Sequence, residues 1–148
     1  MPTLTAFFMA GREVFADTSA IFALLDRRDA DHAQTAAKVG ELVRAGRTMV
    51  ATDYVVAETI NLAMARRGRL VAERVLDLVE QSEGIRIEWI GPDRFAATKR
   101  FFRKYSDRDY SFTDCTSFVV MRELRINDAL TTDGHFADAG FRPLLPVT

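Results

Sequence analysis

Short apolar runs alternate with longer helical patterns along most of the chain, and this alternation is the feature that most constrains its fold. The run Glu13–Asp17 precedes a helical pattern over Ser19–Asp26, and the run Thr48–Thr52 precedes one over Asp53–Arg67. Such alternation is typical of βαβ units, in which parallel strands form a sheet and helices cover both of its faces. The sequence therefore predicts an α/β fold around a mostly parallel sheet.

The rest of the chain continues this pattern. Residues Ile85–Ile90 alternate between apolar and charged side chains, which predicts a strand with one solvent-facing side at the edge of the sheet. The other predicted helices span Asp31–Ala45, Leu70–Ser82, Arg94–Tyr105, Phe112–Leu124 and His135–Ala139, and the other predicted strands span Asp128–Thr132 and Phe141–Leu145. We expect one domain over residues 13–148, preceded by an N-terminal extension, residues 1–12, of undefined role.

The composition narrows the class of function. The 148 residues are 48% hydrophobic and 28% charged, as in a globular domain with a core of its own. Because the formal net charge is -1, nucleic-acid binding would rely on a local basic patch. The runs Arg66–Arg69 and Lys99–Lys104 are candidates, although both also suit solvated helix faces. The single cysteine, Cys115, excludes an intrachain disulfide, and Met1–Gly11 is too short to span a membrane, so we expect a soluble, cytoplasmic protein.

Two acids follow predicted strands. Asp17 comes directly after Val14–Ala16, and Asp133 comes shortly after Ala129–Leu130. In open α/β sheets, ligands bind beyond the carboxyl ends of the strands, so both acids are candidate site residues. Each also has a purely structural interpretation, because Asp17 suits a helix N-cap and Asp133 precedes Gly134 in a turn pattern.

A third acid, Glu58, lies within a predicted helix. It shares one helix face with Val55 and Leu62 by the spacing of three and four residues. A carboxylate within an apolar face must be paired, protonated or bound to a metal. The alternatives for Glu58 are therefore an ion pair with Arg66 or Arg67 and a role in a site.

The fourth acid, Asp114, stands near the start of a predicted helix. Ser111 precedes it by three residues, which is the spacing of a capping box. Asp114 also shares a helix face with Phe118 and Met121, which predicts that it points inward. Both interpretations can hold together, because a helix start can present an oxygen ligand.

The four acids together predict a metal site. In a doubly wound sheet their positions can converge on one cleft, where like charges would raise the pKa of each carboxylate. A hard divalent cation relieves this repulsion, and all-oxygen ligands favour Mg²⁺ or Mn²⁺ over zinc. Such a cluster suits phosphodiester hydrolysis, because the metal lowers the pKa of water and neutralises charge on the phosphate. The predicted catalytic and metal-binding residues are Asp17, Glu58, Asp114 and Asp133.

Four segments of the chain also resemble a known family. The chain is similar to PIN domains of the kind found as the toxin ribonuclease of VapBC toxin–antitoxin systems. The matching segments are Phe15–Ala20, Val56–Asn61, Asp107–Cys115 and Leu130–Phe136. The resemblance implies a three-layer α/β/α sandwich and an endoribonuclease that depends on Mg²⁺ or Mn²⁺, with RNA as its substrate. It places the family's acidic quartet on Asp17, Glu58, Asp114 and Asp133, and leaves open whether Asp107 or Asp109 joins them.

The resemblance further implies a homodimer and a small cognate antitoxin that holds the enzyme inactive. Apolar surface around Phe7, Phe8 and Phe22 is the predicted seat for such a partner. The alternative to an enzyme is a non-catalytic PIN-like module that binds RNA or a partner protein. Thr18 and Ser19 are expected to cap the helix that follows Asp17.

Overall fold

The computed structural model describes residues 11–148, and Met1–Ala10, including Phe7 and Phe8, lie outside the described residues. Within the described part, five strands form one sheet in the order β3-β2-β1-β4-β5, and every neighbouring pair is parallel. The strands are β1 (Glu13–Ala16), β2 (Thr48–Thr52), β3 (Ile85–Glu88), β4 (Asp128–Leu130) and β5 (Arg142–Pro143). The first strand is thus central, and the predicted edge strand over Ile85–Ile90 is at the edge.

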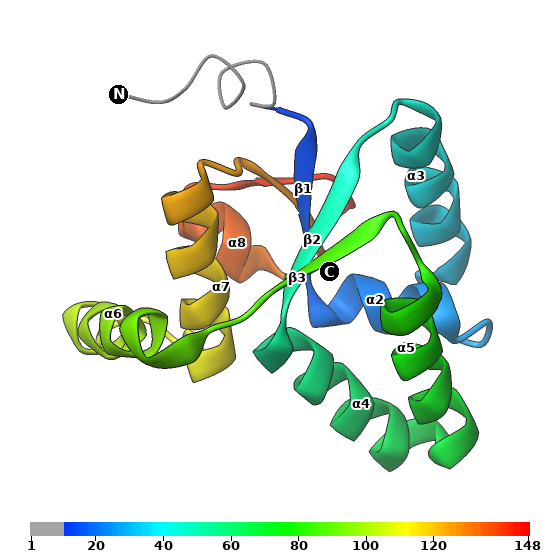
Figure 1. The fold of residues 1–148 in the computed structure, drawn as a ribbon, viewed down its shortest axis with the longest axis horizontal. Coiled ribbons are helices and arrows are strands. Elements are labelled where there is room, and N and C mark those ends of the chain that lie inside the picture. Colours follow the sequence, from blue (N-terminus) through cyan, green and yellow to red (C-terminus); the bar gives the residue numbers. More distant parts are fainter. Residues whose placement is uncertain (1–10) are drawn as a thin grey trace.

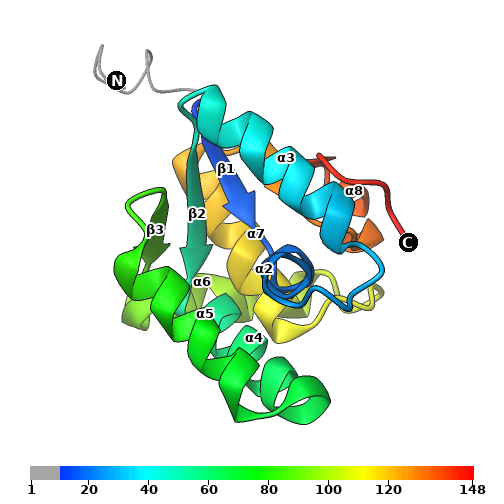
Figure 2. The same ribbon diagram turned by 90° about the vertical axis from the view of Figure 1, so that its right-hand side faces the viewer.

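Helices cover both faces of this sheet. Figure 1 shows α2, α3 and α5 on one side of the strands and α6 and α7 on the other, and Figure 2 looks onto the side that carries α2, α3 and α5. The predicted three-layer α/β/α sandwich is therefore confirmed. No helix in residues 11–148 is long and apolar enough to cross a membrane. The helices are α2 (Thr18–Leu25), α3 (His32–Arg44), α4 (Asp53–Arg67), α5 (Arg69–Gln81), α6 (Gly91–Lys104), α7 (Phe112–Leu124) and α8 (Gly134–Asp138).

The central strand fixes the core. Val14 and Phe15 of β1 have no exposed surface, because the strand is covered by helices on both faces. The Phe15 ring lies 6.2 Å from that of Phe136, and Phe136 meets Phe118 edge-on at 5.0 Å. Burying each of these rings contributes on the order of 2 kcal/mol. The aromatic contacts join β1, α7 and α8, and so hold together the elements that carry Asp17, Asp114 and Asp133.

Some predicted bounds were wrong by a few residues. Helix α6 begins at Gly91 rather than Arg94, because Pro92 stands in the first turn, where its missing N–H costs nothing. Strand β5 is only Arg142–Pro143, since proline cannot donate to a strand ladder. The first strand ends at Ala16, so Asp17 lies just beyond it.

Candidate active site

Pairing of β1 with β4 places Asp17 beside Asp133. Phe15 and Ala16 lie opposite Ala129 and Leu130 in the parallel ladder. The backbone N–H of Asp17 then donates to the carbonyl of Leu130 at 3.1 Å, which continues the pairing one residue beyond the strand. The carboxyl ends of β1 and β4 therefore lie side by side at the same edge of the sheet.

The Asp17 side chain is buried and held by hydroxyl groups. It is 6% exposed, and its Oδ2 accepts hydrogen bonds from Thr131 Oγ1 at 2.9 Å and from Ser19 Oγ at 3.0 Å. Burial raises the pKa of Asp17 to about 6; the hydrogen bond from Thr131 offsets part of this effect, and the charge on Asp114 adds to it. Asp17 is thus an acid whose charged form is destabilised by its surroundings.

Ser19 and Thr131 form a hydroxyl pair that joins the two strand ends. Their oxygens are 3.3 Å apart, and Ser19 Oγ also accepts from the backbone N–H of Thr132 at 3.2 Å. The prediction that Thr18 and Ser19 cap α2 was wrong, because the N-cap residue is Asp17 and it makes no side-chain capping bond. The Ser19 hydroxyl instead orients the Asp17 carboxylate.

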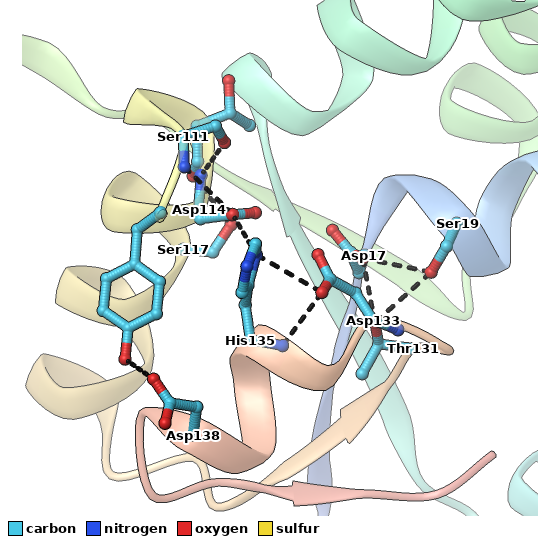
Figure 3. A network of polar contacts seen from close by, with 11 residues as sticks. Asp17, Ser19, Ser111, Asp114, Ser117, Thr131, Asp133, His135 and Asp138 are labelled. Carbon is cyan, nitrogen blue, oxygen red and sulfur yellow. Dashed lines mark hydrogen bonds and ion pairs between the residues drawn. The ribbon is translucent and has the colours of Figure 1, made fainter. Parts of the chain in front are cut away.

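Asp133 and His135 lie on the first turn of α8 (Figure 3). Asp133 is the N-cap, and its Oδ1 accepts from the backbone N–H of His135 at 2.9 Å, as the structural interpretation of the turn predicted. The ring Nδ1 of His135 lies 3.2 Å from Asp114 Oδ2 and 3.4 Å from Asp133 Oδ1. Because ionised carboxylate oxygens only accept, these contacts are favourable when Nδ1 carries a proton. His135 therefore links α7 to α8.

An aromatic contact supports the ring of His135. Tyr110 meets it edge-on, with ring centroids 5.6 Å apart. The Tyr110 hydroxyl donates to Asp138 Oδ2 at 2.6 Å, and Asp138 is labelled in Figure 3. Arg108 forms an ion pair with the same carboxylate. Arg108, Tyr110 and Asp138 thereby limit the movement of His135.

Asp114 serves both as a capping residue and as a wall of the site. The predicted capping box is confirmed: Ser111 Oγ accepts from Asp114 N at 3.0 Å, and Asp114 Oδ2 accepts from Ser111 N at 3.1 Å. The same Oδ2 contacts His135. Ser111 anchors Asp114 to the start of α7, so its carboxylate is fixed in direction.

Glu58 lies on α4 but outside the buried face of that helix. The buried positions are Val55, Thr59 and Ala63, whereas Glu58 is exposed and borders a cavity together with Leu62. The prediction that Glu58 sits within a buried apolar face was therefore wrong. The spacing of three and four residues placed it near that face, but α4 is rotated so that Glu58 borders the cavity.

The alternative prediction of an ion pair for Glu58 was also wrong. Arg67 Nε donates to Asp26 at 2.6 Å, and the guanidinium of Arg66 lies over the ring of Phe22 at 5.7 Å. In the part of the chain that the structure describes, Glu58 forms no salt bridge. Its carboxylate is therefore not neutralised by an arginine.

The four predicted acids all line one cavity of about 360 Å³. Desolvation at the cavity wall, followed by the charge on Asp114, raises the pKa of Glu58. Desolvation also raises the pKa of Asp114; the backbone N–H of Ser111 opposes this, and the charge on Asp133 reinforces it. Mutual repulsion of this kind is relieved when a cation binds. The lining residues are Asp17, Thr18, Ser19, Phe22, Asp29, Asp31, Glu58, Leu62, Arg66, Asp114, Thr132 and Asp133.

Comparison with known proteins identifies the family. A model of the PIN domain matches residues 14–142. This chain belongs to the PIN-domain family. Over 133 residues, or 90% of this chain and 98% of the relative, it is 32% identical to the 23S rRNA-specific endonuclease VapC20 of Mycobacterium tuberculosis, in strains CDC 1551 / Oshkosh and H37Rv. The crystal structure of M. tuberculosis VapC20, described as a sarcin–ricin loop cleaving toxin, matches with a TM-score of 0.80 and 30% identity, covering 90% of this chain and 99% of that one.

The donor set of this PIN domain fits a divalent cation. One ligand atom each from Asp114, Asp133 and His135 lie within 4.8 Å of one another. Asp17 and Glu58 border the same cavity and add carboxylate oxygens. Oxygen-rich sets of this kind suit Mg²⁺ or Mn²⁺, while the imidazole nitrogen also suits Mn²⁺ or another transition metal.

The sequence left open whether Asp107 or Asp109 joins the site of the PIN domain. Asp107 and Asp109 are exposed and do not border the cavity among the described residues. Phe22 is 3% exposed, so the prediction that it offers apolar surface to a partner was wrong.

Thr131 and His135 were not predicted as site residues, although both lie in the Leu130–Phe136 segment that resembles the family. A polar residue two positions from a strand-end acid is the signal that could have found them.

Proposed function

We propose that this protein is a metal-dependent endoribonuclease that hydrolyses RNA phosphodiester bonds and acts as the toxin of a toxin–antitoxin pair. The observation that carries the proposal is the convergence of four carboxylates in one cavity of a PIN domain, where neither Asp17 nor Glu58 has a cationic partner within residues 11–148. The 32% identity to an rRNA endonuclease supports the same reaction class.

The chain's own residues have distinct roles in this proposal. Asp17, Glu58, Asp114 and Asp133 would hold a Mg²⁺ or Mn²⁺ ion. When bound, the ion supplies positive charge that activates water and offsets the negative charge of the phosphodiester. Thr131 fixes the orientation of Asp17 through its hydrogen bond to Oδ2, and such supporting partners commonly affect metal affinity by 10- to 100-fold.

The relatives' descriptions support a choice of substrate. VapC20 is named as specific for 23S rRNA, and its structure is described as that of a sarcin–ricin loop cleaving toxin. We therefore propose RNA as the substrate class and the sarcin–ricin loop of 23S rRNA as the first substrate to test. We further propose a cytoplasmic homodimer that a small cognate antitoxin inhibits.

Cleavage of a labelled sarcin–ricin loop RNA in Mg²⁺ or Mn²⁺ tests the proposal. We expect the protein to cut the RNA, EDTA to stop the reaction, and Asp114→Asn to remove it. Asp107→Asn is a matched control, because its side chain is 78% exposed outside the cavity, and it should cut like the parent. RNA binding without cleavage by the parent protein would favour the non-catalytic module instead, and cleavage that persists in EDTA would contradict metal dependence.

A further inference from the structure

Arg66 stands out among the residues around the acidic cavity. Six of the described lining residues are carboxylic acids, namely Asp17, Asp29, Asp31, Glu58, Asp114 and Asp133, and Arg66 is the only one with a cationic side chain. A polyanionic RNA strand is repelled by such a cavity except where a bound cation or a basic side chain meets its phosphates. The position of Arg66 therefore bears on how the substrate enters.

The two arginines at the end of α4 have different partners. Arg67 has a structural role, because its Nε donates to the buried Asp26 at 2.6 Å. Arg66 is exposed and forms no salt bridge within residues 11–148. Even Asp29 and Asp31, which line the same cavity, accept hydrogen bonds from other groups rather than from Arg66. Its guanidinium is thus available to a ligand.

Contact with Phe22 also holds the Arg66 side chain in place before a ligand binds. Its guanidinium carbon lies 5.7 Å from the centroid of the Phe22 ring, and Phe22 itself is 3% exposed and therefore rigidly packed. A planar guanidinium held in this way loses less conformational freedom when it binds a phosphate, and it can still offer paired N–H donors. This arrangement favours recognition of a phosphate group over a purely solvating role.

The spacing along α4 assigns Arg66 to a different phosphate from the one at the acids. Glu58 and Arg66 are two turns apart on the helix, about 12 Å at 1.5 Å per residue. Leu62 lies between them on the same cavity wall. An RNA strand with one phosphate at the carboxylates would extend along this wall, so that a second phosphate reaches Arg66.

We infer that Arg66 is a substrate-binding residue that holds a non-scissile phosphate of the RNA backbone while the acids act on another. The inference rests on the proposed ribonuclease function and identifies the surface that directs the strand into the site. The Arg66 contact reads the backbone rather than the bases, so it supports affinity and positioning without sequence preference.

Salt-dependent binding of a fluorescein-labelled single-stranded RNA tests this assignment. All variants are compared in an Asp114→Asn background with Mg²⁺, so that hydrolysis does not interfere. Arg66→Gln should weaken binding about tenfold, because a charge-assisted contact is lost. It should also reduce the slope of log Kobs against log salt concentration by about 0.7, the value for one phosphate contact on a single strand.

Two further variants separate this role from a general effect of charge or folding. Arg66→Lys should keep the salt slope but recover only part of the affinity, because lysine lacks the planar fork. Arg74→Gln removes an exposed arginine from α5, outside the cavity lining, and should leave the slope unchanged. Thermal unfolding should show the same midpoint for the Arg66 variants and their parent to within a few degrees.

The outcomes distinguish this inference from the proposed function. If the protein with Asp114 intact cuts RNA but Arg66→Gln binds it with the affinity and salt slope of Arg74→Gln, the Arg66 assignment is wrong and the nuclease proposal stands. The same result is expected if Arg66 instead serves an acidic segment of a partner protein. If the intact protein neither cuts nor binds RNA, the proposed function and the assignment fail together.

Discussion

Two aspartates with little exposed surface, one in β4 and one directly after β1, have opposite surroundings. Asp128 begins β4, and its carboxylate accepts hydrogen bonds from Arg142 at 2.8 and 2.9 Å and from Arg47 at 2.8 Å. Asp17 follows the neighbouring strand β1 at the other end of the sheet, and its carboxylate accepts only from the hydroxyls of Thr131 and Ser19 among side chains of the described residues. Both acids are largely withdrawn from water, but within the described part of the chain only Asp128 has cationic partners.

The pKa values of the two acids reflect this difference. Burial would raise the pKa of Asp128, but hydrogen bonds from Arg142 and Arg47 lower it below its ordinary value. Burial raises the pKa of Asp17 to about 6. One end of the sheet therefore uses Asp128 for stability, and the other leaves Asp17 without a charged partner among the described residues, as expected where a cation is to bind.

The largest contrast should be in catalysis. Asp114→Asn removes a carboxylate from the cavity and should lower RNA cleavage by more than about a hundredfold, because loss of a direct ligand exceeds the effect of an outer-shell partner. Asp128→Asn lies at the opposite end of the sheet and should keep the parent's activity per folded molecule. Single-turnover cleavage, normalised to folded protein by circular dichroism, measures both. Equal losses in the two variants would remove the functional distinction between the two ends.

For the free energy of unfolding, we expect the variant at Asp128 to be affected more than the variant at the site. Asp128→Asn leaves Arg47, whose side chain is 18% exposed, without its charged partner, and should lower the free energy of unfolding by about 2 kcal/mol. Urea unfolding monitored by far-UV circular dichroism gives this value. Asp17→Asn should not destabilise the metal-free protein near neutral pH. The comparison breaks down if Asp17→Asn proves the more destabilising of the two.

Loss of the Thr131 hydrogen bond to Asp17 should lower RNA cleavage, but by less than loss of a carboxylate from the cavity. Thr131→Val keeps the shape of the side chain but removes the hydrogen bond of 2.9 Å to Asp17 Oδ2, so cleavage should fall by about tenfold. The pH at which activity reaches half its maximum should also rise, because this hydrogen bond stabilises the charged form of Asp17. A pH–rate profile of the variant that overlays the parent's would assign Thr131 a structural role alone. Thr116→Val offers a control, since this threonine donates to the Thr113 carbonyl within α7.

The smallest predicted effect is on stability as a function of pH. Asp17 has a pKa of about 6 in the folded state against an ordinary value of 3.8, so the native protein binds more protons between these values. The free energy of unfolding should therefore fall as pH rises from about 4 to about 6. Asp17→Asn removes this contribution and, in EDTA, should make the protein more stable at neutral pH.

Urea unfolding at several pH values measures this difference. The advantage of Asp17→Asn should disappear near pH 4, about where the unfolded acid also gains its proton. If the parent is instead the more stable protein at neutral pH without metal, Asp17 has a compensating partner, and the contrast with Asp128 is lost.

The sequence predicted those elements whose signals are local. Thr48–Thr52, Asp53–Arg67 and Phe112–Leu124 have the predicted bounds, because each combines an apolar pattern with a clear start or stop. The capping box of Ser111 and Asp114 is equally local. Asp17 and Asp133 could be placed at strand ends for the same reason.

Contacts that depend on the order of strands and the rotation of helices could not be predicted. Thr131 reaches Asp17 only because β4 lies next to β1, and no pattern in either strand specifies that neighbour. Glu58 was misplaced because helical spacing gives a face to within one residue, whereas packing decides which residues are buried. The link from His135 to Asp114 likewise requires α7 and α8 to meet.

Calorimetric titration with Mn²⁺ near neutral pH tests most directly whether the carboxyl end of the sheet holds a divalent cation. The parent protein and Asp128→Asn should bind the ion with similar affinity, and Asp17→Asn should bind it at least about tenfold more weakly. Binding of Mn²⁺ by Asp17→Asn with the parent's affinity, or no specific binding by the parent, would contradict the account.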